Sequence, residues 1–232
     1  MKSIFMMLIC TLSMFSETYI FGSVISNSVI NSANIGEEGS GVVVSKTIIP
    51  KSSFNQISID TAGDIRIDNS SKNSIIVTTD DNLVEKVLVY VKNSTLFIKI
   101  KGSITPSKGL SIVINSQFLK KLIVDGASDI TVRNYKLDNL SLNIDGASNI
   151  LFKNNNFNKL HINADGSYDV NLLKSRVNSA YIKADGSGNI EINVKDYMDI
   201  SVMGTTEIKY IGNPKIKKHI DGVAELIKIK RN

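Results

Sequence analysis

One short motif recurs along the second half of the chain at a constant spacing. Each of its four copies starts 20 residues after the previous one: DGASDI at 125–130, DGASNI at 145–150, DGSYDV at 165–170 and DGSGNI at 185–190. A degenerate copy, GTTEI at 204–208, places its glycine 18 residues after Gly186. A repeat of this length is typical of architectures in which each unit packs against its two neighbours. The repeat therefore constrains the fold more than any local motif.

The residues between the copies alternate between apolar and polar types, as in the run Leu140-Ser141-Leu142-Asn143-Ile144. This alternation predicts strands in which every second side chain points inward. Isoleucine and valine, with 34 and 18 copies, also favour strands. Apolar residues at equal places in successive units form the expected columns: Leu122, Leu142, Ile162, Ile182 and Val202; Leu137, Phe157, Val177 and Tyr197; Leu140, Leu160, Ala180 and Ile200.

A 20-residue unit with two or three short strands and no helix predicts one coil of a solenoid. We expect an all-β, single-domain, parallel, right-handed β-helix of about 20 residues per coil, with coils about 4.8 Å apart. The leucine and asparagine spacing of leucine-rich repeats is absent, and so is the GGxGxD nonapeptide of calcium-binding β-rolls. The aligned apolar columns would form one continuous interior.

The Asp-Gly pair marks a corner of each coil. The glycines permit either a positive φ or a close approach between backbones. The small residues Ala127, Ala147, Ser167 and Ser187 are expected on the inner side of this corner. Asp125, Asp145, Asp165 and Asp185 are expected to point outward, one above another.

The region 42–121 is less regular and is expected to cap the N-terminal end of the solenoid, where unpaired strand edges would favour aggregation. Within it, VLVYV (87–91) and LFIKI (96–100) flank a KNST turn and predict a hairpin. The polar C-terminal segment is expected to close the other end.

The N-terminus predicts an exported protein of the periplasm, the outer envelope or the extracellular space. Residues 1–26 combine Lys2 with an apolar run from Ile4 to Phe15, which is typical of a signal peptide. An uncleaved anchor and a lipid attached at Cys10 are the alternatives. Residues 27–41 are rich in Asn, Ser and Gly and predict a flexible linker, which leaves 42–232 as the β-helical domain.

The net charge of +5 is concentrated at the C-terminus. Residues 209–232 contain seven Lys or Arg residues against Asp221 and Glu225. This basic tail is either a solvated chain end or a segment that contacts anionic surfaces. A basic stripe with stacking aromatics is absent, so nucleic-acid binding is not expected.

Few residues suggest chemistry, and we expect no catalytic residue, no metal centre and no cofactor. The column Asp125, Asp145, Asp165 and Asp185 is either a strip that binds Ca²⁺ or sugar, or a set of caps for the glycine turns. Tyr168 and Tyr181 are expected on the outer face of adjacent coils, where their rings could stack on sugars. His161 and His219 are expected to be surface residues rather than catalytic bases. The motifs GxSxG, GxGxxG and HExxH are absent.

Several segments together resemble one known family. They are Phe54-x-x-Ile57-x-Ile59, Gly-Asp-Ile at 63–65, DDNLVEKVLVYVKNSTLFI at 80–98, the DGAS and DGS corners, and IGNPKIKKHIDGVAELIKI at 211–229. Their order and register are similar to the auto-transporter adhesin head GIN domain family. The resemblance implies a β-helical fold and an exported or envelope-associated protein of adhesin type.

On this basis the expected function is non-enzymatic recognition of a glycan or protein through a rigid surface. A purely structural envelope scaffold and a polysaccharide-acting enzyme are the alternatives. The sequence does not predict an oligomeric state.

Overall fold

The computed structural model describes residues 36–230, and they are almost entirely β-structure. They form two units that are described separately. The smaller unit pairs β1 (Glu37–Glu38) with β8 (Ile104–Thr105) in parallel. The larger unit holds all other strands and one short 3₁₀ helix, η1 (Val84–Lys86). No helix in this described range is long and apolar enough to cross a membrane.

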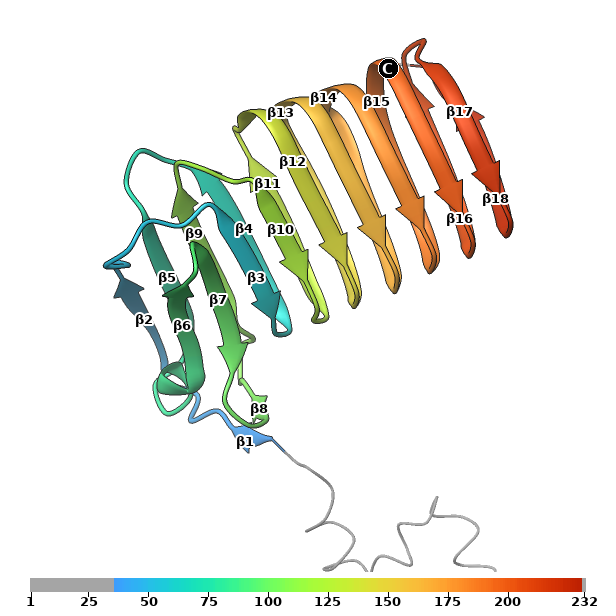
Figure 1. The fold of residues 1–232 in the computed structure, drawn as a ribbon. Helices are drawn as coiled ribbons and strands as arrows, with labels where there is room; N and C mark the ends of the chain where they lie inside the picture. The colour runs from blue at the N-terminus through green and yellow to red at the C-terminus, as the bar shows by residue number, and fades with distance from the viewer. Residues whose placement is uncertain (1–35, 231–232) are drawn as a thin grey trace, which may run out of the picture. The chain divides into compact units, whose positions relative to one another are not determined.

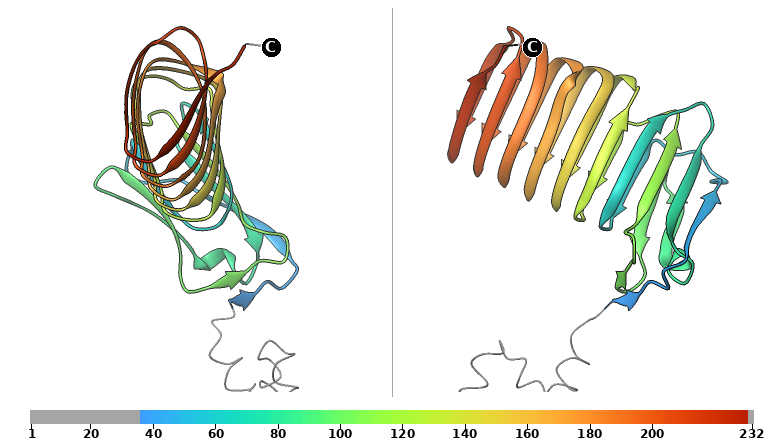
Figure 2. Two further views of the ribbon diagram at one scale, coloured as in Figure 1. Left: turned by 90° about the vertical axis from the view of Figure 1, so that its right-hand side faces the viewer. Right: turned by 180° about the vertical axis from the view of Figure 1, so that it is seen from behind.

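The larger unit is a parallel β-solenoid, as the repeat predicts (Figure 1). Each coil contributes a strand to two opposite faces, so the unit resembles a flattened tube when viewed along its axis (Figure 2). The long strands β13 (Ala147–Ala164), β14 (Ser167–Ala184) and β15 (Ser187–Val202) turn the corner between the faces without interruption. Their first halves belong to one face and their second halves to the other.

We call the two faces the first and the second face. The first face contains the second halves of β13, β14 and β15, and also β7 (Thr95–Ile100), β3 (Gln56–Asp60), β10 (Lys121–Val124), β12 (Lys136–Ile144) and β17 (Lys215–Ile220). The second face contains their first halves, and also β9 (Ser111–Ser116), β4 (Gly63–Asn69), β11 (Ser128–Arg133), β16 (Thr205–Ile211) and β18 (Val223–Lys228).

The order of the coils differs from the order of the chain at the N-terminal end. The coil made by β3 and β4 lies between the later coil of β7 and β9 and the repeat coil of β10 and β11. The chain therefore builds one coil, adds a second coil on its outer side, and then returns across the first to continue the stack.

Antiparallel strands cover the N-terminal end, as expected for a cap. On the second face, β5 (Ser74–Asp80) pairs with β9, and β2 (Val43–Ile48) pairs with β5. On the first face, β6 (Val87–Lys92) and β7 form the predicted hairpin. Its turn residues Asn93 and Ser94 have φ values of 50° and 58°, the pair of positive values found in a type I′ turn.

Part of the segment expected to be a linker belongs to the folded units. The backbone N–H of Gly41 donates to Asp80 Oδ1 at 2.8 Å, and that of Ser40 donates to Asn82 Oδ1 at 2.9 Å. Residues 37–38 form β1. Residues 36–41 are therefore ordered, whereas the predicted signal peptide and the rest of 27–41 lie outside the described residues.

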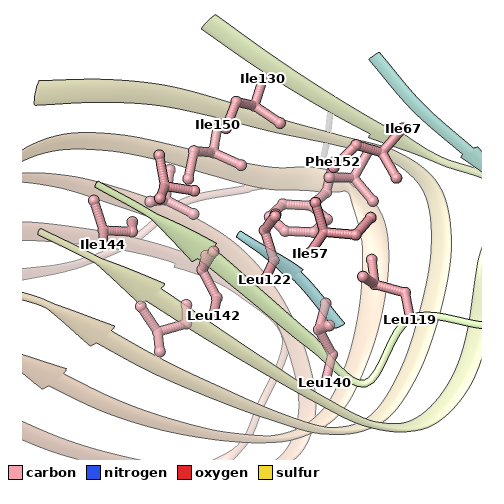
Figure 3. Packing of buried hydrophobic residues seen from close by; sticks show 14 of the residues in the cluster. Ile57, Ile67, Leu119, Leu122, Ile130, Leu140, Leu142, Ile144, Ile150 and Phe152 are labelled. Carbon is pink, nitrogen blue, oxygen red and sulfur yellow. The ribbon is translucent and has the colours of Figure 1, made fainter. Parts of the chain in front are cut away.

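The interior is a continuous apolar core to which both faces contribute side chains (Figure 3). Leu122, Leu142 and Ile162 are in register on the first face and are fully buried. Ile130 and Ile150 are the corresponding pair on the second face. Because most inward positions on the two faces are apolar and stacked on a similar side chain, each coil completes the core of the next.

The corner glycines are explained by close backbone approach. A Cβ atom added to Gly146 would lie 2.1 Å from the carbonyl oxygen of Gly126, and one added to Gly166 would lie 2.1 Å from that of Gly146. All three glycines are described, and none of them has a positive φ, so backbone conformation does not require glycine here. Any side chain at this corner would force successive coils apart.

The column next to the corner was predicted with the wrong parity. Ala127, Ala147, Ser167 and Ser187 are exposed, and the following residues point inward instead. Ser128 and Ser148 are buried, and their hydroxyls donate to carbonyl oxygens of the preceding coil, those of Thr61 and Gly126. The buried positions Val124, Ser128 and Ile130 keep one parity across the corner, so the alternation of the strands itself places Ala127 outward.

Tyr168 occupies this inward column, so its expected place on the outer face is wrong. Its side chain is 4% exposed, and its neighbours in the column are Ser148 and Gly188. The absent side chain of Gly188 leaves space for the ring. Tyr168 is therefore a core residue and is unavailable for stacking on a sugar.

From Gly186 onward the coils are two residues shorter than the preceding ones, which shifts the expected columns. Val194 pairs with Val177, Met198 with Ala180, and Ile200 with Ile182. Tyr197 thus leaves the predicted apolar column and lies on the outer side. The 18-residue spacing of the last repeat is the sequence signal of this shortening.

The C-terminal segment extends the solenoid instead of closing it. β17 and β18 add one more parallel coil, and no other described strand pairs with their outer edges. Lys218 stands in register with the buried Ile200, at a position where earlier coils carry apolar residues. A lysine at an inward position of a terminal strand protects that edge from pairing with another sheet.

Candidate functional site

The outer surface of the first face gathers most of the side chains that the sequence singles out. Because strands alternate, the residues between the buried Ala180, Ile182 and Ala184 point outward, and the same holds in every coil. Parallel pairing in register then stacks equivalent residues into outward columns. Two columns and one row of aromatic side chains define the candidate site.

The predicted aspartate column is present along the edge of this face. The backbone N–H groups of Asp145, Asp165 and Asp185 donate to Val124, Ile144 and Ala164 of the preceding coil at 2.8–2.9 Å. Together with Asp125, these residues line a shallow groove of about 530 Å³. The four carboxyl groups therefore follow one another along the solenoid axis, one per coil.

Lysine pairs with the last aspartate of the column and with Asp60 on the adjacent strand β3. Lys183 Nζ lies 2.8 Å from Asp185 Oδ2, and this hydrogen bond raises the pKa of the Lys183 ammonium. Beyond the other end of the column, Lys99 Nζ lies 2.9 Å from Asp60 Oδ2. No described group of three or more His, Cys, Asp or Glu residues is arranged to hold a metal ion. A single row with one carboxylate per coil suits hydrogen bonds to hydroxyl groups better than the enclosing shell of oxygen ligands that Ca²⁺ requires.

Asparagine side chains line the same groove beside the aspartates. Asn143 and Asn163 are adjacent in one outward column, and Asn163 Nδ2 donates to Asn143 Oδ1 at 3.3 Å. Asn143 Oδ1 also accepts a hydrogen bond from the Ser141 hydroxyl, and these contacts hold both amides in fixed orientations. A groove with amide donors and carboxylate acceptors matches the hydroxyl groups of a sugar.

A row of aromatic rings runs next to this groove. The rings of His161 and Tyr181 are stacked, with centroids 4.7 Å apart and planes at 10°. Tyr197 continues the row at 5.9 Å from Tyr181, tilted by 55°. On the other side of His161 the column holds Ser141, whose small side chain leaves that ring without a further aromatic neighbour. We call His161, Tyr181 and Tyr197 the aromatic strip.

The structure retains one of the two predicted stacking residues and adds two others. Tyr181 is half-buried on the outer face, as expected, while Tyr168 is in the core. His161 was expected at the surface but without a role, and Tyr197 was assigned to an apolar column. The outward parity of His161 and Tyr181 at a 20-residue spacing is a signal that the sequence contains, whereas Tyr197 requires knowledge of the shortened coil.

A parallel β-solenoid with such an outer face defines a class of rigid, strand-built repeat proteins. Residues 53–214 match the family described as "Putative auto-transporter adhesin, head GIN domain". This match spans more than half of the chain, and the chain belongs to that family. The family recognised from the sequence motifs is thus confirmed. No functionally curated protein matches the chain.

Solved structures of bacterial proteins share the fold. A protein of Bacteroides fragilis titled a putative adhesin is 25% identical, with a TM-score of 0.62, over 84% of this chain and 100% of that one. One from Parabacteroides merdae with the same description is 21% identical, with a TM-score of 0.58 and the same coverage. A third, from Parabacteroides distasonis and titled a putative lipid binding protein, is 23% identical, with a TM-score of 0.58, over 83% and 99% of the two chains.

Proposed function

We propose that this protein is an exported, non-enzymatic adhesin-like protein that binds a glycan on the first face of its solenoid. The family and the printed descriptions of the similar proteins support the adhesin-like part. The aromatic strip beside the Asn and Asp groove supports a glycan as the ligand. Export to the cell envelope or beyond agrees with the family and with the predicted signal peptide.

The observation that carries the proposal is that the aromatic strip and the groove lie side by side on the same strands. Tyr181 and Lys183 are outward neighbours on β14, so the ring of Tyr181 lies beside a residue that lines the groove. A pyranose ring has an apolar C–H face and a rim of hydroxyl groups. Aromatic side chains with a nearby set of amides and carboxylates provide contacts for both.

The rigidity of the face adds to this argument. Tyr181 is held on a strand that pairs with β13 on one side and β15 on the other. The side chains are therefore placed before a ligand arrives, and little conformational entropy is lost on binding. A shallow groove of this kind favours an extended polymer over a small molecule that needs enclosure.

The test is a glycan array probed with the full chain and with two variants. Tyr181→Ala is expected to weaken binding at least tenfold, because it removes the central ring of the strip. Tyr90→Ala is the matched control, since Tyr90 is an exposed tyrosine that stacks on Phe97 outside the strip. Equal loss in both variants, or the absence of any glycan bound by the unaltered chain, contradicts the proposal.

Two further measurements separate the alternative functions. A scaffold would bind no glycan and would co-purify with envelope material whether or not Tyr181 is present. An enzyme would shorten a bound polysaccharide, which chromatography of the ligand after incubation detects. Either result replaces glycan recognition as the function.

A further inference from the structure

The shortened coil leaves a notch at the corner where the second face leads into the first. Leu172 pairs with Ile192, and Ser179 pairs with Tyr197, so the chain takes two residues fewer to turn this corner in the later coil. The backbone of the following coil lies close by: a Cβ atom added to Gly212 would overlap the carbonyl oxygen of Val194. The missing residues are thus not replaced, and a hollow of about 560 Å³ remains.

The notch has an apolar base and a polar rim. Val177, Val194 and Ile211 line it from three successive coils, and the two valines are fully buried. The polar side chains that surround them are Asn156, Arg176, Asn178, Asn193, Lys195 and Asn213. This combination provides an apolar patch on which a sugar ring can pack and several hydrogen-bonding groups around it.

The charge of the notch is positive. No carboxylate lines it, whereas Arg176 and Lys195 both do. Lys195 has a distant partner in Asp196, at 3.6 Å, but Arg176 forms no ion pair with any described residue. An exposed guanidinium without a partner, at the edge of a hollow, is available for a carboxylate that can accept two parallel hydrogen bonds.

The amides of the rim are held by contacts within the protein. Asn178 Nδ2 donates to Asn158 Oδ1 at 3.1 Å, and Asn193 Nδ2 donates to the Ser175 carbonyl oxygen at 3.1 Å. Both bonds use the Nδ2 atom, so the Oδ1 atoms of Asn178 and Asn193 are not engaged by them. The rim therefore presents oriented acceptors for hydroxyl groups as well as the charge of Arg176.

We infer that this notch binds a sugar residue that carries a carboxylate, such as a hexuronate, within a longer glycan. Arg176 takes the carboxylate, the asparagine amides take ring hydroxyls, and the partly exposed side chain of Ile211 takes the C–H face. Arg176 and Tyr181 lie five residues apart on β14, a distance on the order of 15 Å along an extended strand. The notch thus forms one end of the surface that carries the aromatic strip, and the inference rests on the proposed function in taking the ligand to be a saccharide.

Calorimetric titration of the full chain with trigalacturonate and with its methyl ester tests the inference. The ester keeps the sugar rings and removes the charge. We expect the acid to bind at least tenfold more tightly than the ester, and Arg176→Gln to abolish this difference. Lys174→Gln is the control, because it removes the same charge from an exposed position of the same corner that does not line the notch.

Several outcomes overturn the inference. They are equal affinity for acid and ester, equal weakening by both variants, and no binding of either ligand. Thermal unfolding of each variant checks that the fold is kept, which the exposed, unpaired state of Arg176 favours. If Tyr181→Ala leaves array binding intact while Arg176→Gln removes the acid preference, the role of the aromatic strip is rejected and that of the notch is supported. If Tyr181→Ala weakens array binding while Arg176→Gln leaves the acid preference unchanged, only the role of the notch is rejected.

Discussion

The hydroxyl of Tyr168 lies 2.6 Å from Thr206 Oγ1, although the two residues belong to coils that are not adjacent. The coil between them carries Gly188 in the same column, and a Cβ there would lie 2.6 Å from Tyr168 Cδ2. The tyrosine therefore reaches across a glycine to a buried threonine. Three residues in three coils act as one packing unit.

Tyr168→Phe is expected to lower the free energy of unfolding by about 1–2 kcal/mol, because it leaves the buried Thr206 hydroxyl without its partner. Burial raises the pKa of the Tyr168 hydroxyl above its ordinary value. Urea unfolding monitored by circular dichroism measures the change. Tyr181→Phe on the outer face is the control and should change stability by less than about 0.5 kcal/mol.

Asn155→Ala is expected to destabilise the solenoid by about 2–3 kcal/mol. The Asn155 side chain is buried, accepts from the Tyr135 N–H at 2.9 Å and donates to the Val132 carbonyl oxygen at 2.9 Å. Its loss leaves two backbone groups unsatisfied inside the corner. The exposed neighbour Asn156 provides the control, and equal melting temperatures for the Asn155→Ala and Asn156→Ala variants would contradict the role of these two hydrogen bonds.

Arg133→Gln is expected to make the protein less stable at neutral pH but not in acid. Arg133 Nε lies 2.6 Å from Asp68 Oδ1, and this hydrogen bond holds the pKa of the Asp68 carboxyl below its ordinary value. A lowered pKa stabilises the fold above the unfolded-state value of about 3.9, and this contribution disappears as the pH falls through the folded-state pKa. The difference between the two proteins should be about 1 kcal/mol at pH 7.

Unfolding curves at pH 7, 5 and 3 measure this difference. It should remain constant from pH 7 to pH 5 and become smaller at pH 3. A difference that is the same at all three values would show that Arg133 contributes through packing alone.

Lys218→Leu is expected to cause self-association. Lys218 stands at an inward position of the last described coil, and its replacement would complete an apolar column on an unpaired parallel edge. Sedimentation velocity should then show dimers or larger species at concentrations where the unaltered chain is smaller. Lys215→Leu alters an exposed lysine of the same strand and should leave the sedimentation coefficient unchanged.

Local patterns in the sequence were sufficient for much of this structure. The 20-residue period, the alternation of Leu140 to Ile144 and the glycine at each corner predict coils, inward columns and close backbone contacts. The Asn93–Ser94 turn identifies the hairpin of β6 and β7. These features depend on residues that are near in sequence or exactly repeated, so that simple stacking reproduces them.

Other features were decided by how the coils meet in three dimensions. The exchange of order between the first two coils and the outward turn of Tyr197 follow from contacts between segments that are distant in sequence or changed in length. Tyr168 was misplaced for another reason, since it shares the parity of its buried neighbour Val170. The notch beside Arg176 is a consequence of the change in length. A periodic sequence determines what each coil contains, but the space left at a shortened corner depends on the backbones of its neighbours, and it exists only once the stack has formed.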